Sequence, residues 1–574
     1  MTSEASQALQ QAMQAFEAAW QAADRAALNA ALSSLQQIDP AHAWTHFARG
    51  MLARLDQQPR QAISAFEAAL RAEPQSWEAW LVLGQLQLQQ SQLTAAIQSL
   101  AQASRLRPDC LSAWESLVRA LLLRGDHTTL QALLQDLLHP DWPGQLPQKH
   151  LFDPEHFQRL RCIWASYYLL NRFAQPDCTQ AEINALLARW GQSFPASQPP
   201  ALHLPSRKAE RPLHIGWVSN EWFSPVAQRI FWPLLAFYDA SNYTVTVYAD
   251  DAQSGEMPAR PRALKQVHHS KDWDTEQFCR QIHADAIDIL VDLSGLFNPL
   301  RLDALRCRPA PLQISAATNP PFSSGLPEVS WRWSDKLLSP PEMCTAYLEQ
   351  THYLPSFIGW QAPPESPEPV APPCLHNGFI SFGALASANK LNAEVLQLWG
   401  QLLARLPEAQ LHLKSPLYAD PPSCEAILQS LTAAGCQRRQ IHFESGDGSL
   451  QGQLAFLKRC DILLDSFPYA GALSTCDAFW MGVPVLSLRD SRRLAQCMHQ
   501  QVGTASAWLA DSPEHWLALG QQAARQPAQL NTWRQQLRPM LLASPIGQIE
   551  QHAAEQQASY RQIWRQWCLS DYNS

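Results

Sequence analysis

The 574-residue sequence has no long apolar run, no dense block of basic residues and no Cys-x-x-Cys pair. Because a membrane-spanning helix needs about 18 or more predominantly apolar residues, we expect no membrane insertion. The formal charge of −8, without a Lys/Arg cluster, argues against binding to nucleic acid or anionic lipid. The first residues, MTSEASQALQQAMQ, lack the basic and then apolar segments of an export signal. The expected location is therefore the cytoplasm.

Several catalytic signatures are also absent. The sequence contains no G-x-x-x-x-G-K-[ST], G-x-G-x-x-G, H-E-x-x-H or G-x-S-x-G, so ATPase, dinucleotide dehydrogenase, zinc protease and hydrolase functions lose their main support. Its 13 cysteines are odd in number and scattered, which fits neither a disulfide framework nor a zinc site. The adjacent His268 and His269 have no carboxylate or cysteine at ligand spacing, so we interpret them as a solvated loop. We expect reduced thiols, no metal and no cofactor.

An internal repeat occupies the first 140 residues. Pro40, Pro74 and Pro108 are spaced at the 34-residue period of a tetratricopeptide helix pair. Small residues such as Gly84 and Ala96 let two helices approach closely, while larger side chains fill the seam. We expect two clear units and two degenerate flanking ones, with an unrelated helical bundle as the alternative. The residues in phase are Trp80, Leu83, Leu100 and Ala103, with Gly50, Ala62, Phe66 and Ala69 one unit earlier and Trp114, Leu117, Leu130 and Leu134 one unit later.

The pattern of apolar and polar residues changes after residue 210. Short β-branched runs bounded by turns alternate with longer amphipathic segments, a pattern that is typical of βα units on a parallel sheet. Two such series, separated by a Pro-rich segment, predict two Rossmann-like domains with a ligand cleft between them. The expected fold class is an N-terminal α-solenoid followed by these two α/β domains. The expected divisions are helical repeats at 1–140, a helical transition and Pro-rich linker at 141–210, a first lobe at 211–360, a linker at 361–375 and a second lobe with closing helices at 376–574.

One segment of the second lobe, DILLDSFPYAGALSTCDAFWMGVPV at 461–485, combines a strand, a Pro/Gly-containing turn and a helix start. A helix start offers unpaired backbone N–H groups to an anion, so a diphosphate would fit at Ser474 and Thr475. Asp477 follows within the same helix. It is either a ligand-binding carboxylate or a structural acidic residue favoured by the helix dipole.

This segment, together with FGALASANKLNAEVLQLWGQLLARLPEAQLHLKS at 382–415 and LRCRPAPLQ at 305–313, resembles the tetratricopeptide-bearing O-linked N-acetylglucosamine transferase family, also called SPINDLY-like. The resemblance extends over nearly the whole chain, including the IGWVS strand, YLPS at 353–356 and the terminal YRQIWRQWC. It implies a two-lobed glycosyltransferase fold of the GT-B kind, with the nucleotide sugar held mainly by the second lobe and no required metal.

The resemblance also implies roles for individual residues. Lys390 occupies the position of the family lysine that contacts the donor diphosphate, where an ammonium would stabilise the charge that develops on departing UDP. An exposed surface lysine is the alternative. Asp477 matches the aspartate that binds the ribose hydroxyls, since a carboxylate can accept two hydrogen bonds. Gly471, Ser474 and Thr475 fall in the diphosphate loop.

The sequence departs from the family pattern at the cleft. Gln453 stands where the family has a histidine and is expected to contact the nucleotide sugar by hydrogen bonding. In SNEWFSPVAQRI, Ser224 replaces the family's active-site histidine, and serine is no base near neutral pH unaided. Glu221 lies at the aspartate of the pattern and is available as a replacement carboxylate, so both join Lys390 as candidate catalytic residues. A shortened loop places Arg492 or Arg493 either over a phosphate or in a solvated basic loop.

The function that follows is transfer of a sugar from a nucleotide donor, by resemblance GlcNAc from UDP-GlcNAc, to Ser or Thr of a protein, with inversion. The acceptor protein is expected to dock on the repeats. There the sixth position of each unit, often Asn in the family, holds Ala48, Val82 and Ser116, which favours a different peptide or a folded partner. The alternatives are a catalytically impaired member that acts as a repeat-based interaction scaffold, or a transferase with a different nucleotide sugar.

Overall fold

The computed structural model of the chain describes residues 3–139, 154–193, 206–251, 259–316, 323–363, 365–446, 448–490 and 492–570. These residues fall into two compact units. The first comprises Met1–Leu160 and Leu417–Glu425, and the second comprises Arg161–Pro416 and Ala426–Ser574. The stretches 141–153 and 194–205 of the expected transition and linker lie outside the described residues.

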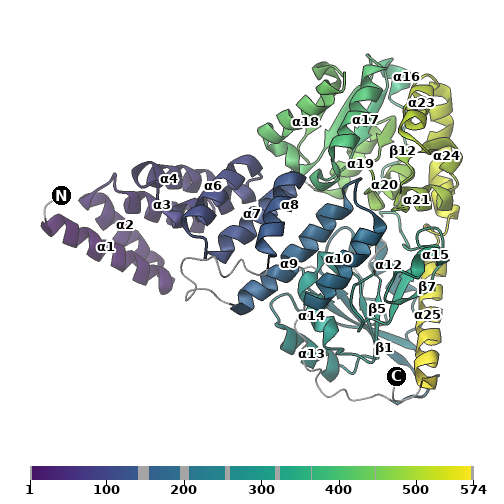
Figure 1. Cartoon of the computed structure of the whole chain (residues 1–574), viewed down its shortest axis with the longest axis horizontal. Helices are drawn as coiled ribbons and strands as arrows, with labels where there is room; N and C mark the ends of the chain where they lie inside the picture. Colours follow the sequence, from purple (N-terminus) through teal and green to yellow (C-terminus); the bar gives the residue numbers. More distant parts are fainter. Residues whose placement is uncertain are drawn as a thin grey trace. The chain divides into compact units, whose positions relative to one another are not determined.

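The first unit is a series of helix pairs, drawn from purple to blue in Figure 1. Gly84 and Gly50 stand at equivalent positions where two paired helices meet. A Cβ atom on Gly84 would lie 2.6 Å from Cγ of Leu100, and one on Gly50 would lie 2.9 Å from the ring of Phe66. The helices therefore approach closely enough to require glycine. They are α1 (Ser3–Gln21), α2 (Arg25–Ile38), α3 (Ala43–Leu55), α4 (Pro59–Ala72), α5 (Trp77–Gln89), α6 (Leu93–Leu106), α7 (Leu111–Arg124) and α8 (His127–Leu137).

Two of the three prolines that mark the repeat, Pro74 and Pro108, accept the same hydrogen bond. Trp80 donates its indole N–H to the carbonyl of Pro74 at 2.9 Å, and Trp114 donates its own to the carbonyl of Pro108 at 2.8 Å. An unrelated bundle would not repeat the same side-chain contact in register. The predicted helical repeat is thus confirmed.

The first lobe of the second unit is built on a seven-stranded sheet in which all strands are parallel. The strand order is β3-β2-β1-β4-β5-β6-β7, so the chain runs outward from β1 on one side and from β4 on the other. In such sheets the carboxyl ends of the two central strands border a crevice that takes the ligand. The strands are β1 (Leu213–Ser219), β2 (Tyr243–Ala249), β3 (Leu264–His269), β4 (Ile289–Asp292), β5 (Leu312–Ser315), β6 (Trp331–Ser334) and β7 (Gln350–Tyr353).

Helices precede the first sheet and connect its strands. They are α9 (Pro154–Phe173), α10 (Gln180–Ser193), α11 (Ala227–Ile230), α12 (Trp232–Ala236), α13 (Thr275–Ala284), the 3-10 helix η3 (Gly295–Phe297), α14 (Pro299–Arg306) and α15 (Pro341–Cys344).

The second lobe repeats this plan on a smaller scale. Its six parallel strands have the order β10-β9-β8-β11-β12-β13, so β8 and β11 border its crevice. The strands are β8 (Ser381–Ala384), β9 (Gln410–Lys414), β10 (Ile441–Glu444), β11 (Ile462–Leu464), β12 (Val485–Leu488) and β13 (Leu509–Ala510). The helices from Cys374 onward are α16 (Cys374–Asn377), η4 (Ala388–Lys390), α17 (Ala393–Ala404), η5 (Pro416–Ala419), α18 (Pro421–Ala433), η6 (Arg438–Gln440), α19 (Leu450–Lys458), α20 (Leu473–Trp480), α21 (Leu494–Val502), α22 (Ala505–Trp508), α23 (Pro513–Ala524), α24 (Pro527–Ala543) and α25 (Ile549–Leu569). Of these, the stretch Leu417–Glu425 in η5 and α18 belongs to the first unit.

The last helix, α25, returns to the first lobe, and Figure 1 draws it in yellow beside β7. Trp217 of β1 donates its indole N–H to the hydroxyl of Tyr560 at 3.0 Å, and Trp333 of β6 donates to Ser559 at 2.8 Å. The buried tryptophan rings of the first sheet therefore pack against α25. The helices that precede α25 in the sequence belong to the second lobe. The expected division at 376–574 assigned α25 to that lobe as well. That division stays a prediction.

The architecture predicted from the sequence, an α-solenoid followed by two Rossmann-like α/β domains, is confirmed. One local interpretation differs. His268 and His269 end strand β3 instead of lying in a loop, and the ring of His268 bonds with the carboxylate of Asp285 (Nε2–Oδ2 2.9 Å). Alternation along an edge strand and solvation in a loop both place polar side chains in water, so the pair alone did not distinguish them.

Candidate active site

A pocket of about 260 Å³ opens where the crevices of the two sheets meet. The first lobe contributes the loops that follow β1 and β4, with Asn220, Glu221 and Phe297 among their lining residues. The second lobe contributes Lys390 and Ser474. Three of the residues predicted from the sequence, Glu221, Lys390 and Ser474, therefore line one pocket.

The loop that carries Glu221 is held by bonds from its own backbone. The N–H of Glu221 donates to Oγ of Ser219 at 3.1 Å. The two residues that follow, Trp222 and Phe223, donate their N–H groups to the carboxylate of Asp251, each at 2.8 Å. The Glu221 side chain is thereby left to face the pocket.

Glu221 is exposed at the pocket. The surrounding protein nevertheless removes enough water to raise the pKa of its carboxyl group, and the negative charge of Asp251 raises the pKa further. A carboxylate whose pKa is raised is a stronger base than an ordinary glutamate. Glu221 is therefore suited to take a proton from a bound hydroxyl.

Ser224 lies away from the lining of the pocket, at the start of α11. Its hydroxyl oxygen accepts the backbone N–H groups of Val226 (3.2 Å) and Ala227 (3.3 Å). These bonds stabilise the turn that leads into α11. The catalytic role of Ser224 stays a prediction.

Lys390 follows strand β8 and ends the 3-10 helix η4. Its ammonium group donates to the carbonyl of Ala470 at 2.9 Å and lies 4.1 Å from the centre of the Tyr469 ring. Burial lowers the pKa of Lys390 to about 8, and the carboxylate of Asp465 offsets part of that effect. A cation held by a carbonyl and an aromatic face, beside an open pocket, attracts an anionic ligand.

The carboxylate of Asp465 holds the turn between β11 and α20 through hydrogen bonds. One oxygen of its carboxylate accepts the N–H groups of Ser466 (3.0 Å) and Gly471 (2.9 Å), and the other accepts the hydroxyl of Ser487 (2.9 Å). A Cβ atom on Gly471 would lie only 2.3 Å from Oγ of Ser474. A larger residue here would displace the Ser474 hydroxyl, so glycine keeps the turn close to the start of α20.

The two hydroxyls at the start of α20 point to different places. Ser474 lines the pocket. Thr475 is buried and donates its hydroxyl to the carbonyl of Gly471 at 3.0 Å. Only Ser474 is thus available to a ligand in this conformation, together with the backbone N–H groups of the helix start.

Asp477 and Gln453 are hydrogen-bonded to each other, away from the lining of the pocket. The Asp477 carboxylate is completely buried and forms an ion pair with Arg229, while Gln453 donates its amide to the other oxygen at 2.7 Å. Burial raises the pKa of Asp477, and the Arg229 guanidinium counteracts that effect. Neither residue lines the pocket. Their assignment to the nucleotide sugar stays a prediction.

Arg229 was not predicted as the partner of Asp477. A carboxylate inside the otherwise apolar run CDAFWMG needs a buried counter-charge, and this requirement is the signal that was available. The partner lies 248 positions away on α11 of the other lobe, so no local pattern connects the two.

Arg492 has neither of the positions considered from the sequence. Its side chain is fully buried and lies 4.9 Å from the centre of the Phe173 ring. It donates to the carbonyls of Phe173 (3.3 Å) and Cys178 (2.7 Å), at and just beyond the end of α9. A cation at a helix C-terminus satisfies carbonyls that the helix leaves unpaired. Arg492 therefore fixes the end of α9.

The described residues contain no group of three or more His, Cys, Asp or Glu side chains arranged to hold a metal ion. Among their helices, none combines the length and the apolar character needed to cross a membrane.

Two protein families match parts of the chain. Residues 53–121 match the family described as tetratricopeptide repeat, and residues 197–362 match the family described as glycosyl transferase family 41. The solved structure of an O-GlcNAc transferase mutant from Thermobaculum terrenum superposes with a TM-score of 0.77 at 24% sequence identity. It covers 92% of this chain and 98% of that one, which confirms the two-lobed fold with its helical N-terminal part.

Curated relatives from plants match most of the chain. One from Oryza sativa subsp. japonica, named "Probable UDP-N-acetylglucosamine–peptide N-acetylglucosaminyltransferase SPINDLY", is 29% identical over 393 residues, or 67% of this chain and 42% of that protein. The Arabidopsis thaliana protein of the same name is 28% identical over 395 residues, or 67% and 43%. The chain thus spans less than half the length of these relatives.

Proposed function

Because this chain belongs to the tetratricopeptide-containing glycosyltransferases of family 41, we propose that it transfers a sugar from a UDP-sugar to a Ser or Thr hydroxyl of a protein. The sugar we propose is GlcNAc, after the names of the plant relatives. The observation that carries the proposal is the pocket itself, which places Glu221 on one wall and Lys390 on the other.

The proposed reaction is a single displacement with inversion. The acceptor oxygen bonds to the anomeric carbon while the bond from that carbon to the UDP oxygen breaks, and the hydroxyl proton passes to Glu221. Negative charge then develops on the leaving diphosphate. Lys390, Ser474 and the N–H groups at the start of α20 are placed to stabilise that charge without a metal.

The remaining predicted residues lie outside the lining of the pocket. Gly471 lets the turn approach α20, and Thr475 bonds back to Gly471. We propose that Asp477 and Gln453 contact the ribose only after Arg229 gives up its bond to Asp477. That exchange is the most demanding step of the proposal, because the ion pair is buried.

A second candidate function follows from the same ion pair. A carboxylate already neutralised by Arg229 and bonded by Gln453 is a poor ligand for ribose. This observation favours a protein that binds partners through its repeats without transferring a sugar. A transferase with a different nucleotide sugar stays the other alternative from the sequence.

We also propose that a protein acceptor docks on the repeats of the first unit. The expected contact positions Val82 and Ser116 are partly exposed, while Ala48 is completely buried. Shape and apolar contact would then govern recognition more than a ladder of amides. A reducing, cytoplasmic location is part of the proposal, and the 13 free cysteines, most of them buried, are compatible with it.

The test is a thermal-shift panel of UDP, GDP, UDP-GlcNAc, UDP-Glc and GDP-Fuc on the wild type and on Lys390→Ala. A ligand at 100 times its Kd stabilises the folded state by about 2.7 kcal/mol. We expect uridine nucleotides to raise the melting temperature of the wild type and not that of Lys390→Ala. Lys336→Ala is the matched control, because Lys336 is an exposed lysine beside an aromatic ring, Tyr353, away from the pocket. No response of the wild type to any nucleotide would favour the scaffold function.

A further inference from the structure

Phe297 leaves a large apolar surface on the wall of the pocket. Its side chain is 42% exposed, whereas Phe231, the other phenylalanine among the described lining residues, is only 7% exposed. Water around an exposed aromatic ring is released when a ligand covers it, so such a ring in a pocket favours an apolar ligand face.

The turn that presents Phe297 is fixed by hydrogen bonds. At the end of β4, Asp292 accepts the N–H groups of Ser294 and Gly295, each at 3.0 Å, and Gly295 has a φ of +54°, which favours glycine. Asn220 donates its amide to the carbonyl of Phe297 at 2.7 Å and its N–H to Oγ of Ser294 at 3.0 Å. The loops after β1 and β4 are thus joined to each other by hydrogen bonds.

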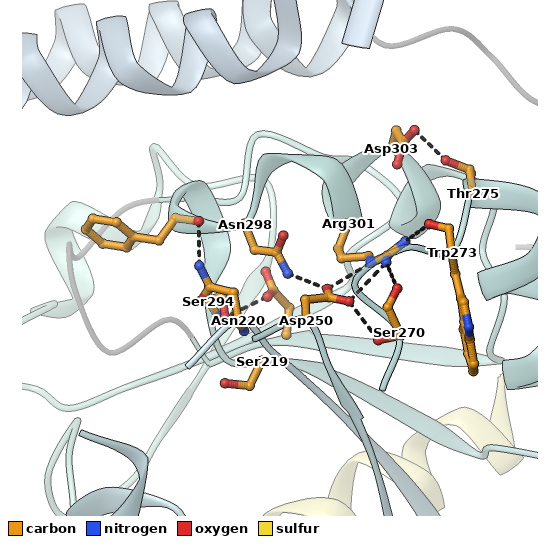
Figure 2. Close-up of polar contacts among 12 residues, drawn as sticks. Ser219, Asn220, Asp250, Ser270, Trp273, Thr275, Ser294, Asn298, Arg301 and Asp303 are labelled. Atoms are coloured by element: carbon orange, nitrogen blue, oxygen red, sulfur yellow. Dashed lines mark hydrogen bonds and ion pairs between the residues drawn. The ribbon is translucent and has the colours of Figure 1, made fainter. Parts of the chain in front are cut away.

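A buried ion pair between Arg301 and Asp250 supports these two loops, as Figure 2 shows. Arg301 and Asp250 are joined by two hydrogen bonds of 2.8 and 2.9 Å, and both side chains are nearly inaccessible to solvent. Asn298, the neighbour of Phe297, donates to the same carboxylate at 2.7 Å, and Arg301 also donates to the carbonyl of Trp273 at 3.0 Å. The charges are satisfied within the protein, so the network positions Phe297 and binds no ligand itself.

We propose that the ring of Phe297 is the surface on which the donor's sugar ring stacks, an assignment that rests on the proposed function. One face of a pyranose consists of C–H groups, whose slightly positive hydrogens are attracted to the negative face of an aromatic ring. The same wall offers Asn220, Glu221 and Ser294 to hydroxyl groups. The pocket volume of about 260 Å³ lies just below the range of about 300–1,000 Å³ for drug-sized ligands, so it suits a monosaccharide.

The position of Phe297 on the Glu221 wall distinguishes the sugar from the uracil base. Lys390 and Ser474 lie on the opposite wall, where the diphosphate is proposed to bind. The anomeric carbon must lie between that diphosphate and Glu221 for the transfer to occur. The sugar ring therefore lies on the side of Phe297, and the base extends from the other end of the diphosphate.

Calorimetric titration of the full chain with UDP and with a UDP-sugar tests the assignment. The UDP-sugar is whichever of UDP-GlcNAc and UDP-Glc binds the wild type more tightly. For Phe297→Ala we expect the ratio of the Kd of the UDP-sugar to the Kd of UDP to rise about two- to tenfold, the strength of an aromatic contact. Phe297→Tyr retains the ring and should keep the ratio within about twofold of the wild type.

Phe237→Ala is the matched control. Phe237 belongs to the same lobe, is also 42% exposed, and its carbonyl likewise accepts a side-chain amide, from Gln557 at 3.2 Å. It does not line the pocket, so both Kd values should stay at the wild-type level.

Two results would overturn the assignment. An unchanged ratio in Phe297→Ala would mean that the sugar does not contact the ring. Equal losses of affinity for UDP and the UDP-sugar would mean that the ring stacks on the base or only holds the wall in place. A wild type that binds neither UDP nor a UDP-sugar would instead reject the proposed function, and this assignment with it.

Discussion

The ion pair between Arg229 and Asp477 joins α11 of the first lobe to α20 of the second. Asp477 is 0% and Arg229 is 6% exposed, so neither charge is stabilised by water. Asp477→Asn preserves the shape of the side chain but removes the negative charge. Its new amide group also sets hydrogen-bond donors against the donors of Arg229 and Gln453.

Removing one partner of a buried ion pair leaves an uncompensated charge and costs about 3–5 kcal/mol of the free energy of unfolding. We expect Asp477→Asn and Arg229→Met each to lose that amount. The double variant buries no isolated charge, so its loss should fall short of the sum of the single losses by about 2 kcal/mol or more.

Urea-induced unfolding followed by tryptophan fluorescence measures these free energies. Arg489→Met is the control, because Arg489 forms an exposed pair with Asp511 and should lose less than about 1 kcal/mol. Strict additivity of the double variant, or a loss in Asp477→Asn no larger than in the control, would refute the reasoning. UDP affinity of Asp477→Asn gives a second reading: a decrease indicates that the carboxylate reaches the ribose, and an unchanged affinity indicates that Arg229 retains it.

Three further predictions follow from single residues. Burial lowers the pKa of Lys390 to about 8, so the ammonium charge is lost as the pH rises through about 8; UDP affinity measured by calorimetry should fall over that range, and Lys390→Met should lack the tight binding at every pH. Burial raises the pKa of Asp490 from 3.8 to about 7, so the folded state holds that proton more tightly than the unfolded state. Stability in urea should therefore decline from about pH 4 to about pH 7, and Asp490→Asn should flatten the decline and be the more stable protein at about pH 8. Gly84→Ala places a methyl group against Leu100 and should cost about 1–3 kcal/mol in urea unfolding of the first unit, with a smaller cost when Leu100→Ala is also present.

Much of the fold could be predicted because its signals are local and periodic. The 34-residue spacing of the prolines predicted the repeat. The spacing has a structural cause, because Pro74 and Pro108 accept the same bond from Trp80 and Trp114. Alternating strands and helices predicted both sheets. A parallel sheet brings the carboxyl ends of its central strands together, which is why Glu221 after β1 and Lys390 after β8 reach a common pocket although they are distant in sequence.

The remainder depended on contacts between distant elements, which no single sequence contains. Arg492 is in a loop that resembled a solvated basic segment, yet its guanidinium is buried against the end of α9. Asp477 and Arg229 are paired across the lobes for the same reason. Phe297 could not be identified from the sequence, because an aromatic residue in GLFNPL is typical of a core position and its exposure depends on how the neighbouring loops are bonded.

The return of α25 to the first lobe means that the chain passes between the lobes twice. One passage is near Trp360, the other lies between α24 and α25, and a backbone hydrogen bond from Trp360 to Ile546 at 2.8 Å joins them side by side. Together with the buried ion pair between Arg229 and Asp477, these two connections restrain sliding and twisting of one lobe against the other. The pocket walls that carry Glu221 and Lys390 are therefore tied to each other at the two crossings and at the ion pair.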